Sequence, residues 1–280
     1  MNVNITFCLI QPPFKGRRPI SKNYIKMSKL AISSLIKTGF SKENIQLICY
    51  DDDHSIYFKN KYGIRTKTCS VIPKKFKKMF TQKGTTKKYF FYKPIAFYHE
   101  ARCPIDDNTV MCYSDVDAIF KKNPTKFILS QKTDVWTPEG VILPRRRKLS
   151  EGKVVNPKMT YDSLKEFYWK CGGGALAHLH LKYKWDLDRQ SHFTNFFAVK
   201  PHVYTSLIER WYEMCEIVLQ RDDQEKGDQE IFTAALWSLG LSHSRSPRLL
   251  FKNKYCNQYE CGAKKHMAKD YKKIMGAKKK

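Results

Sequence analysis

Short β-rich apolar runs alternate with stretches of helical periodicity along the first 120 residues of this 280-residue chain. A helix between two strands makes a crossover connection, and such connections are typical of parallel sheets with helices on both faces. The sequence therefore predicts an α/β fold with a mixed, mainly parallel sheet flanked by helices. In chain order we expect strands at 3–10, 45–50, 64–72 and from about 109, with helices at 21–37 and about 86–101.

The second half of the chain is less regular, but it shows no break that would mark a linker. We therefore expect a single domain over residues 1–280, with a frayed basic tail from about 262. A basic, breaker-rich run at 144–159 is interpreted as a loop. The remaining expected elements are strands at 133–138, in CGGGALAH (171–178) and in FTNFFAVKP (193–201), and helices at about 202–221 and in GDQEIFTAALWSLG (227–240).

The run NTVMCYSDVDAIF at 108–120 ends an apolar strand with two acids that are one residue apart. Alternate positions on an extended chain point the same way, so Asp115 and Asp117 can face one site. In a parallel α/β sheet, ligands bind beyond the carboxyl ends of the strands. Two carboxylates held together need a cation between them, and hard oxygen ligands suit Mn²⁺ or Mg²⁺, which bridge to substrate phosphates. The alternative is an ordinary surface loop, because D-x-D is a short pattern.

The formal charge of +26, from 52 basic and 26 acidic residues, points to an anionic partner such as nucleic acid, an anionic membrane or a phosphorylated small molecule. The even spread of the lysines is also typical of a surface that only keeps a protein soluble. We expect no membrane span, because no apolar run approaches 18 residues. Nine cysteines, an odd number placed mostly in apolar runs, indicate reduced thiols and a cytoplasmic protein.

Four patterns in one order make the chain resemble the nucleotide-sugar-dependent glycosyltransferases of the GT-A fold, over roughly residues 3 to 240. They are the acids after the second strand, D-x-D, FTNFFAVKP and GDQEIFTAAL. In that family the D-x-D holds Mn²⁺ or Mg²⁺ against the diphosphate of the donor. The strand after it commonly reads N-S-G-V, whereas here Asn195 is followed by two phenylalanines, which puts the acceptor side in doubt.

In length and lysine content the chain is also similar to glycosyltransferases of large algal viruses. Among these are chlorovirus enzymes that transfer xylose to the capsid-protein glycan. The resemblance implies a UDP-sugar donor, UDP-xylose in particular, and a fucose-bearing glycan acceptor. It also implies action in the cytoplasm of the host.

The resemblance to the GT-A family implies roles for particular residues. Asp115 and Asp117 would hold the metal together with a histidine from the C-terminal part, for which His266 is preferred and His243 is the other option. Asp228 would be the general base of an inverting enzyme, or would contact the sugar in a retaining one; Glu230 and Asp223 are the alternatives. The expected contacts to the nucleotide are Arg17, Asp51, Asp52, Asp115 and Lys272.

Two other classes of function stay open at this point. The charge fits a metal-dependent nucleic-acid-binding enzyme, since paired acids with a metal also serve nucleases. However, the sequence has no basic helix, no aromatic RNA-binding motif and no strong zinc pattern, so no nucleic-acid partner is expected. A non-catalytic carbohydrate-binding or scaffold protein is the other class, and it would not need D-x-D at a strand end.

Overall fold

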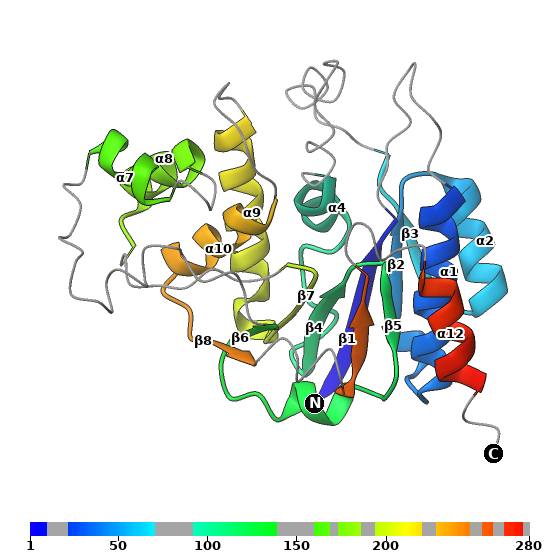
Figure 1. Ribbon diagram of the computed structural model, residues 1–280. Helices are drawn as coiled ribbons and strands as arrows, with labels where there is room; N and C mark the ends of the chain where they lie inside the picture. Colours follow the sequence, from blue (N-terminus) through cyan, green and yellow to red (C-terminus); the bar gives the residue numbers. More distant parts are fainter. Residues whose placement is uncertain are drawn as a thin grey trace.

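The computed structural model describes residues 1–9, 22–70, 92–138, 160–168, 173–185, 194–219, 228–246, 254–259 and 266–276. Within these residues, seven strands form one sheet in the order β3-β2-β1-β4-β7-β6-β8, with helices on both faces (Figure 1). The first four are mutually parallel, and β7 runs antiparallel to β4 and β6. The predicted mixed, mainly parallel sheet is therefore confirmed. Its strands are β1 (Asn2–Cys8), β2 (Ile45–Cys49), β3 (Arg65–Thr68), β4 (Thr109–Ser114), β6 (Val135–Pro138), β7 (Phe196–Val199) and β8 (His243–Ser246).

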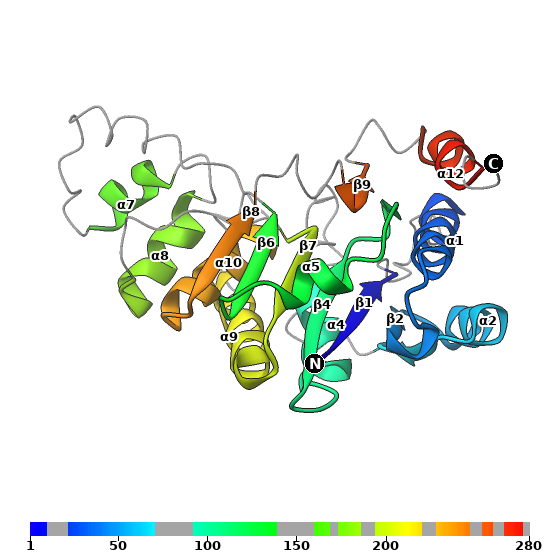
Figure 2. The same cartoon turned by 90° about the horizontal axis from the view of Figure 1, so that it is seen from below.

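Helices cover both faces of the sheet, and the central strands are buried on both sides. All residues of β2 and β4 are buried, as expected for parallel strands between two helical layers. Figure 2 shows α1 on one side of β1 and β4, and α4 and α9 on the other. One face carries α1 (Lys22–Lys37), α2 (Asp52–Tyr62) and α5 (Thr125–Leu129). The other carries α4 (Tyr92–Glu100), α7 (Tyr161–Phe167), α8 (Gly173–Tyr183), α9 (Pro201–Leu219) and α10 (Asp228–Ser238).

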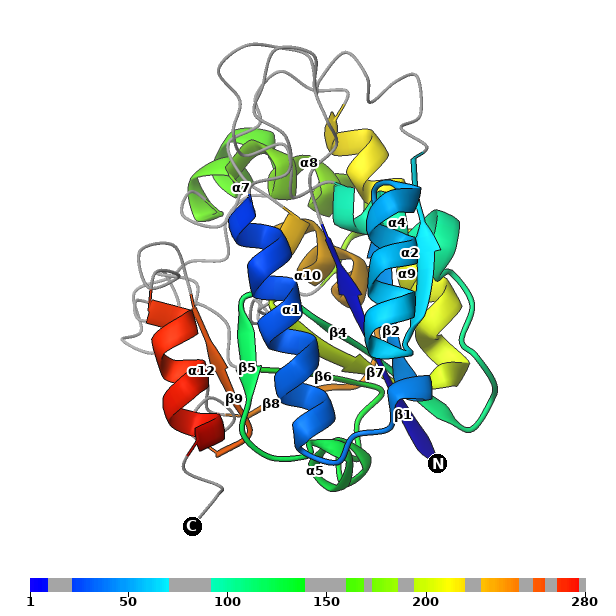
Figure 3. The ribbon, with the colours of Figure 1, turned by 90° about the vertical axis from the view of Figure 1, so that its right-hand side faces the viewer.

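The end of the chain returns to the sheet. A second, two-stranded sheet pairs β5 (Ala118–Phe120) with β9 (Cys256–Gln258) in antiparallel fashion. Beyond it, α12 (Met267–Gly276) packs on α1 and buries Met267 (Figure 3). The prediction of a frayed tail from about 262 is therefore wrong for 267–276, because one face of α12 finds an apolar partner in α1.

Two other predictions about local structure are wrong. The run 171–178 was expected to be a strand, but residues from Gly173 onward form α8, which buries Leu176 and Leu179 among the neighbouring helices. The helix α2 was not expected after the second strand. It is only weakly amphipathic, but its ends are marked: Asp51 caps its first turn, and Gly63 ends it with a positive φ of 65°.

Other local predictions are confirmed. Gly39 and Gly240 end α1 and α10 with φ of 83° and 62°, the left-handed conformation that glycine adopts without steric cost.

The loop expected at 144–159 lies outside the described residues. None of the described helices is both long and apolar enough to cross a membrane.

Candidate active site

The D-x-D segment lies at the carboxyl edge of the sheet, between two segments from distant parts of the sequence. The backbone N–H of Asp115 donates to the carbonyl of Asn195, just before β7, at 2.9 Å. The carbonyl of Asp117 accepts from the backbone N–H of Tyr259, just after β9, at 2.8 Å. The run FTNFFAVKP and the C-terminal part are therefore both neighbours of D-x-D, as the resemblance implies. Both acids are partly exposed.

A buried lysine that the sequence did not single out holds Asp115. The Nζ of Lys93 lies 3.2 Å from Oδ1 of Asp115, and its side chain is 3% exposed against 29% for the aspartate. The same ammonium lies 3.4 Å from the carbonyl oxygen of Thr194 and 4.5 Å from the ring centre of Tyr113. The hydroxyl of Tyr113 donates to the same Oδ1. Two groups therefore orient this carboxylate before any ligand arrives. The signal in the sequence was a lysine surrounded by apolar residues at the start of a helix.

Replacing Lys93 by methionine is expected to lower the free energy of unfolding by about 1–3 kcal/mol, since a partly buried carboxylate loses its counter-charge while the aliphatic stem is kept. Urea unfolding, followed by circular dichroism in the presence of a chelator, measures the change. The double variant Lys93→Met, Asp115→Asn is expected to recover part of that loss. Strictly additive effects of the two substitutions would show that the pair is not coupled.

Two side chains at this edge suit a hard divalent cation. Asp115 and Asp117 offer carboxylate oxygens, and Mg²⁺ in particular is commonly held by one or two carboxylates plus substrate phosphates and waters. However, no group of three His, Cys, Asp or Glu side chains able to hold a metal ion occurs among the described residues. The described residues thus hold no ready three-ligand cluster, so a cation here would be held by Asp115 and Asp117 together with substrate phosphates, and His266 as a third ligand stays a prediction.

The two candidate histidines lie in different places. His266 is exposed at the start of α12, and the hydroxyl of Tyr259 donates to Asp270 of that helix at 3.0 Å, which ties α12 to the segment beside Asp117. His243 begins β8, which is separated from β4 by β7 and β6. Three strand spacings correspond to about 14 Å, so His243 is outside the reach of a metal at D-x-D.

This difference predicts the effect of removing each histidine. The variant His266→Ala is expected to raise the Mn²⁺ concentration needed for half-maximal sugar transfer by at least about tenfold, because the ion loses a direct ligand. The matched control His243→Ala is expected to leave that concentration unchanged. Titration of activity with Mn²⁺ measures both, and equal effects of the two variants would remove His266 from the ligand set.

The residues expected to contact the nucleotide lie on different elements. The carboxylate of Asp51 caps the first turn of α2. It accepts from the backbone N–H of His54 at 2.8 Å, and its Oδ1 lies 2.7 Å from His54 Nδ1. Asp52 and Lys272 are exposed, on α2 and α12 respectively. Arg17 lies outside the described residues.

The acid proposed to activate the acceptor begins a helix, as the sequence predicts. α10 starts at Asp228, whose side chain lies outside what the structure describes. Of the alternatives, Glu230 is partly buried in the first turn of the same helix, and Asp223 lies outside the described residues.

The cysteines at this edge are not reactive groups. Burial raises the pKa of the Cys8 thiol well above its usual value and that of Cys49 to about 12. Both thiols are therefore protonated at neutral pH, and neither offers a thiolate as nucleophile or metal ligand. The charged side chains that meet at this edge are the carboxylate of Asp115 and the ammonium of Lys93.

Comparison with known proteins gives a likeness in fold. No family model matches the sequence, and no curated protein matches it at a significant level. The galactosyltransferase LgtC, solved in complex with donor and acceptor sugar analogs, matches with a TM-score of 0.51 at 11% identity, over 99% of this chain and 96% of that chain. An active-site mutant of LgtC matches with the same TM-score at 10% identity. Mouse xyloside xylosyltransferase 1 matches with a TM-score of 0.43 at 10% identity, over 88% of this chain and 85% of that chain. The chain thus has the GT-A fold of glycosyltransferases.

Proposed function

We propose that this protein is a metal-dependent glycosyltransferase that moves a sugar from a UDP-sugar to a hydroxyl group of a glycan. The observation that carries the proposal is the position of Asp115 and Asp117 at the carboxyl end of β4. They stand in a chain whose fold matches, over nearly its whole length, a galactosyltransferase solved with donor and acceptor sugar analogs. The diphosphate of a UDP-sugar is negatively charged, which also agrees with the excess of basic residues in the chain.

The site residues divide into four tasks under this proposal. Asp115 and Asp117, with His266, would hold Mn²⁺ or Mg²⁺, which when bound offsets the negative charge that grows on the leaving UDP. Lys93 and Tyr113 keep Asp115 in position. Asp228, at the start of α10, takes the proton from the acceptor hydroxyl in an inverting reaction. The residues proposed to contact the nucleotide are Arg17, Asp51, Asp52 and Lys272.

The particular sugars form a finer part of the proposal. Similarity to the chlorovirus enzymes supports xylose from UDP-xylose as the transferred sugar and fucose on a capsid-protein glycan as the acceptor. The same similarity supports a viral protein that acts in the cytoplasm of its host.

Calorimetric titration with a panel of UDP-sugars, each with Mn²⁺ and with chelator, tests the function. We expect one UDP-sugar to bind in a metal-dependent way and UDP itself to bind as well. Incubation of that donor with candidate acceptors then identifies the product by mass. The absence of binding by any UDP-sugar, together with oligonucleotide binding that weakens steeply with salt, would instead indicate a nucleic-acid enzyme.

A further inference from the structure

A cavity of about 600 Å³ opens on the face of the sheet that carries α4, away from D-x-D. Its strand residues come from the early part of β2, from β3 and from the middle of β4, whereas Asp115 and Asp117 follow the end of β4. Residues 98–105, from the last turn of α4 onward, form the opposite wall. Because Lys93 at the start of α4 meets Asp115, the two sites lie toward opposite ends of this helix. The cavity has the size of a small-molecule pocket.

The floor of this cavity is polar where a covered sheet is normally apolar. Gln46 on β2 and Arg65 on β3 are paired in register, so their backbones lie one strand spacing apart, about 4.8 Å. Asn4 and Thr6 on β1 are fully buried, and Nη2 of Arg65 donates to Oδ1 of Asn4. Helix-facing positions of parallel strands are ordinarily filled by Val, Ile or Leu. Packing alone therefore does not account for these side chains.

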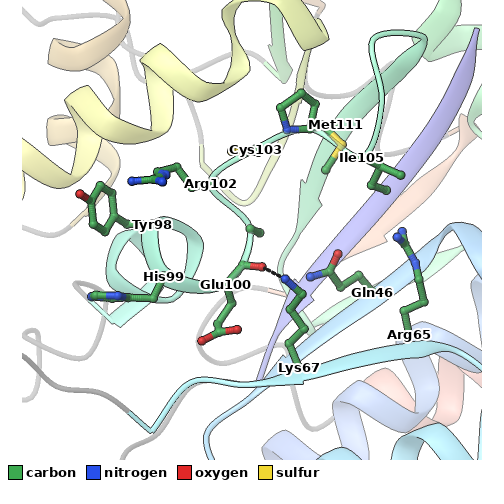
Figure 4. Close-up of a pocket in the computed structure, with 12 residues that line it drawn as sticks. Gln46, Arg65, Lys67, Tyr98, His99, Glu100, Arg102, Cys103, Ile105 and Met111 are labelled. Atoms are coloured by element: carbon green, nitrogen blue, oxygen red, sulfur yellow. Dashed lines mark hydrogen bonds between the residues drawn. The ribbon is translucent and has the colours of Figure 1, made fainter.

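Two hydrogen-bond donors in this floor have no partner. The side chain of Gln46 is 5% exposed, yet its Nε2 makes no hydrogen bond, and Nε of Arg65 makes none either. Leaving a buried donor unpaired is destabilising. Both residues line the cavity, and Figure 4 shows their side chains around it with Lys67 and Glu100. Both donor atoms are buried, so acceptor oxygens of a ligand in the cavity would satisfy them after a small rotation of the two side chains.

The charge of the lining points to an anion. Arg65 and Lys67 line the cavity together with one carboxylate, that of Glu100. Arg102 also lines it, but its Nε lies 3.7 Å from Oε1 of Glu209, which does not. Nζ of Lys67 donates to the backbone carbonyl of Glu100 at 2.5 Å, so it is not neutralised by the carboxylate through that contact. Burial also lowers the pKa of Arg65, which means that its charge is poorly solvated in the absence of a counter-ion. Two cations against one acid leave an excess of positive charge in the lining, and a guanidinium suits an anionic group such as a phosphate.

We propose that this cavity binds a small phosphorylated metabolite, whose phosphate lies on the amide of Gln46 and the guanidinium of Arg65. A phosphate monoester carries about −1.5 to −2 charges at neutral pH and offers three acceptor oxygens. The planar guanidinium suits its geometry. The rest of the metabolite has room against Tyr98, Ile105 and Met111, which line the same cavity. This site is separate from the proposed sugar-transfer site, and it does not depend on the metal.

Calorimetry on the full chain, in chelator and at elevated salt, tests the proposal. The probes are inorganic phosphate, glucose 6-phosphate, glucose and citrate. We expect glucose 6-phosphate to bind more tightly than inorganic phosphate, and glucose not to bind. Citrate binding equal to that of the phosphate ester, or the absence of binding by both phosphate probes at millimolar concentration, would overturn the proposal.

Variants connect the binding to the cavity. Gln46→Leu and Arg65→Lys are each expected to weaken glucose 6-phosphate binding by at least about tenfold, because each removes a hydrogen bond to a charged group. The charge control Lys59→Met, an exposed position on α2, is expected to change nothing. Since Nε2 of Gln46 has no partner to lose, the leucine variant is expected to keep or raise Tm, so weaker binding would not reflect unfolding. Unchanged affinity in both cavity variants would refute the site.

A chemical label provides a local readout. Cys103 lines the cavity and is exposed, whereas the other cysteines of the described residues are buried. Glucose 6-phosphate is expected to slow alkylation of Cys103, measured by peptide mapping, in proportion to its occupancy. Slowing that persists in Arg65→Lys, or the absence of slowing at a saturating concentration, would place the ligand elsewhere.

Discussion

Asp117→Asn is expected to reduce sugar transfer by at least about a thousandfold while the fold stays intact. A cation at the leaving diphosphate supplies several kcal/mol of transition-state stabilisation, and each 1.36 kcal/mol corresponds to about a tenfold change in rate. An amide keeps the size of the side chain but removes the charge that attracts the ion. The pair of Lys93 and Asp115 is kept in this variant, so circular dichroism is expected to show an intact fold.

The measurement is kcat and KM with the UDP-sugar that binds, across a range of Mn²⁺ concentrations. Asp107→Asn is the matched control, because Asp107 is an exposed acid that precedes the same strand at its other end. That variant is expected to keep full activity. If Asp117→Asn also kept full activity at low Mn²⁺, the assignment of D-x-D as the metal site would be wrong.

Asp228→Asn is expected to lower kcat by about 10²–10⁴-fold, the usual contribution of a general base. Donor binding is expected to persist, because the acid acts on the acceptor hydroxyl and not on the diphosphate. Asp228 begins α10, and a helix N-terminus favours the charged form of a carboxylate. A general base needs that charged form to accept a proton.

Steady-state kinetics with a saturating donor, together with the anomeric configuration of the product by NMR, separate the two roles proposed for Asp228. Loss of kcat with an inverted product supports the base. Loss with a retained product would instead make Asp228 a contact to the sugar. Asp162→Asn, which alters an exposed acid in the first turn of α7, is the control. Equal activity of the Asp228 and Asp162 variants would exclude both roles.

The sequence by itself determined the α/β architecture and the place of D-x-D. Both follow from local patterns: apolar runs of strand length, helical spacing, and two acids directly after a strand. Gly39 and Gly240 ended their helices as predicted, because a positive φ at a helix end is a local requirement. Local patterns failed where a helix was weakly amphipathic, as in α2, and where a glycine cluster preceded a helix, as in α8.

Tertiary structure alone decided which groups meet. The pairing of Lys93 with Asp115 joins a helix start to a strand end, and no periodicity reports such a partner. The return of the C-terminal segment to Asp117 depends on the pairing of β9 with β5, and it separates His266 from His243. The cavity at Gln46 and Arg65 likewise combines strands that are adjacent only in the folded sheet. Hydrophobic patterning specifies that a face is buried, whereas contacts between distant segments depend on register and packing that exist only once the chain has folded.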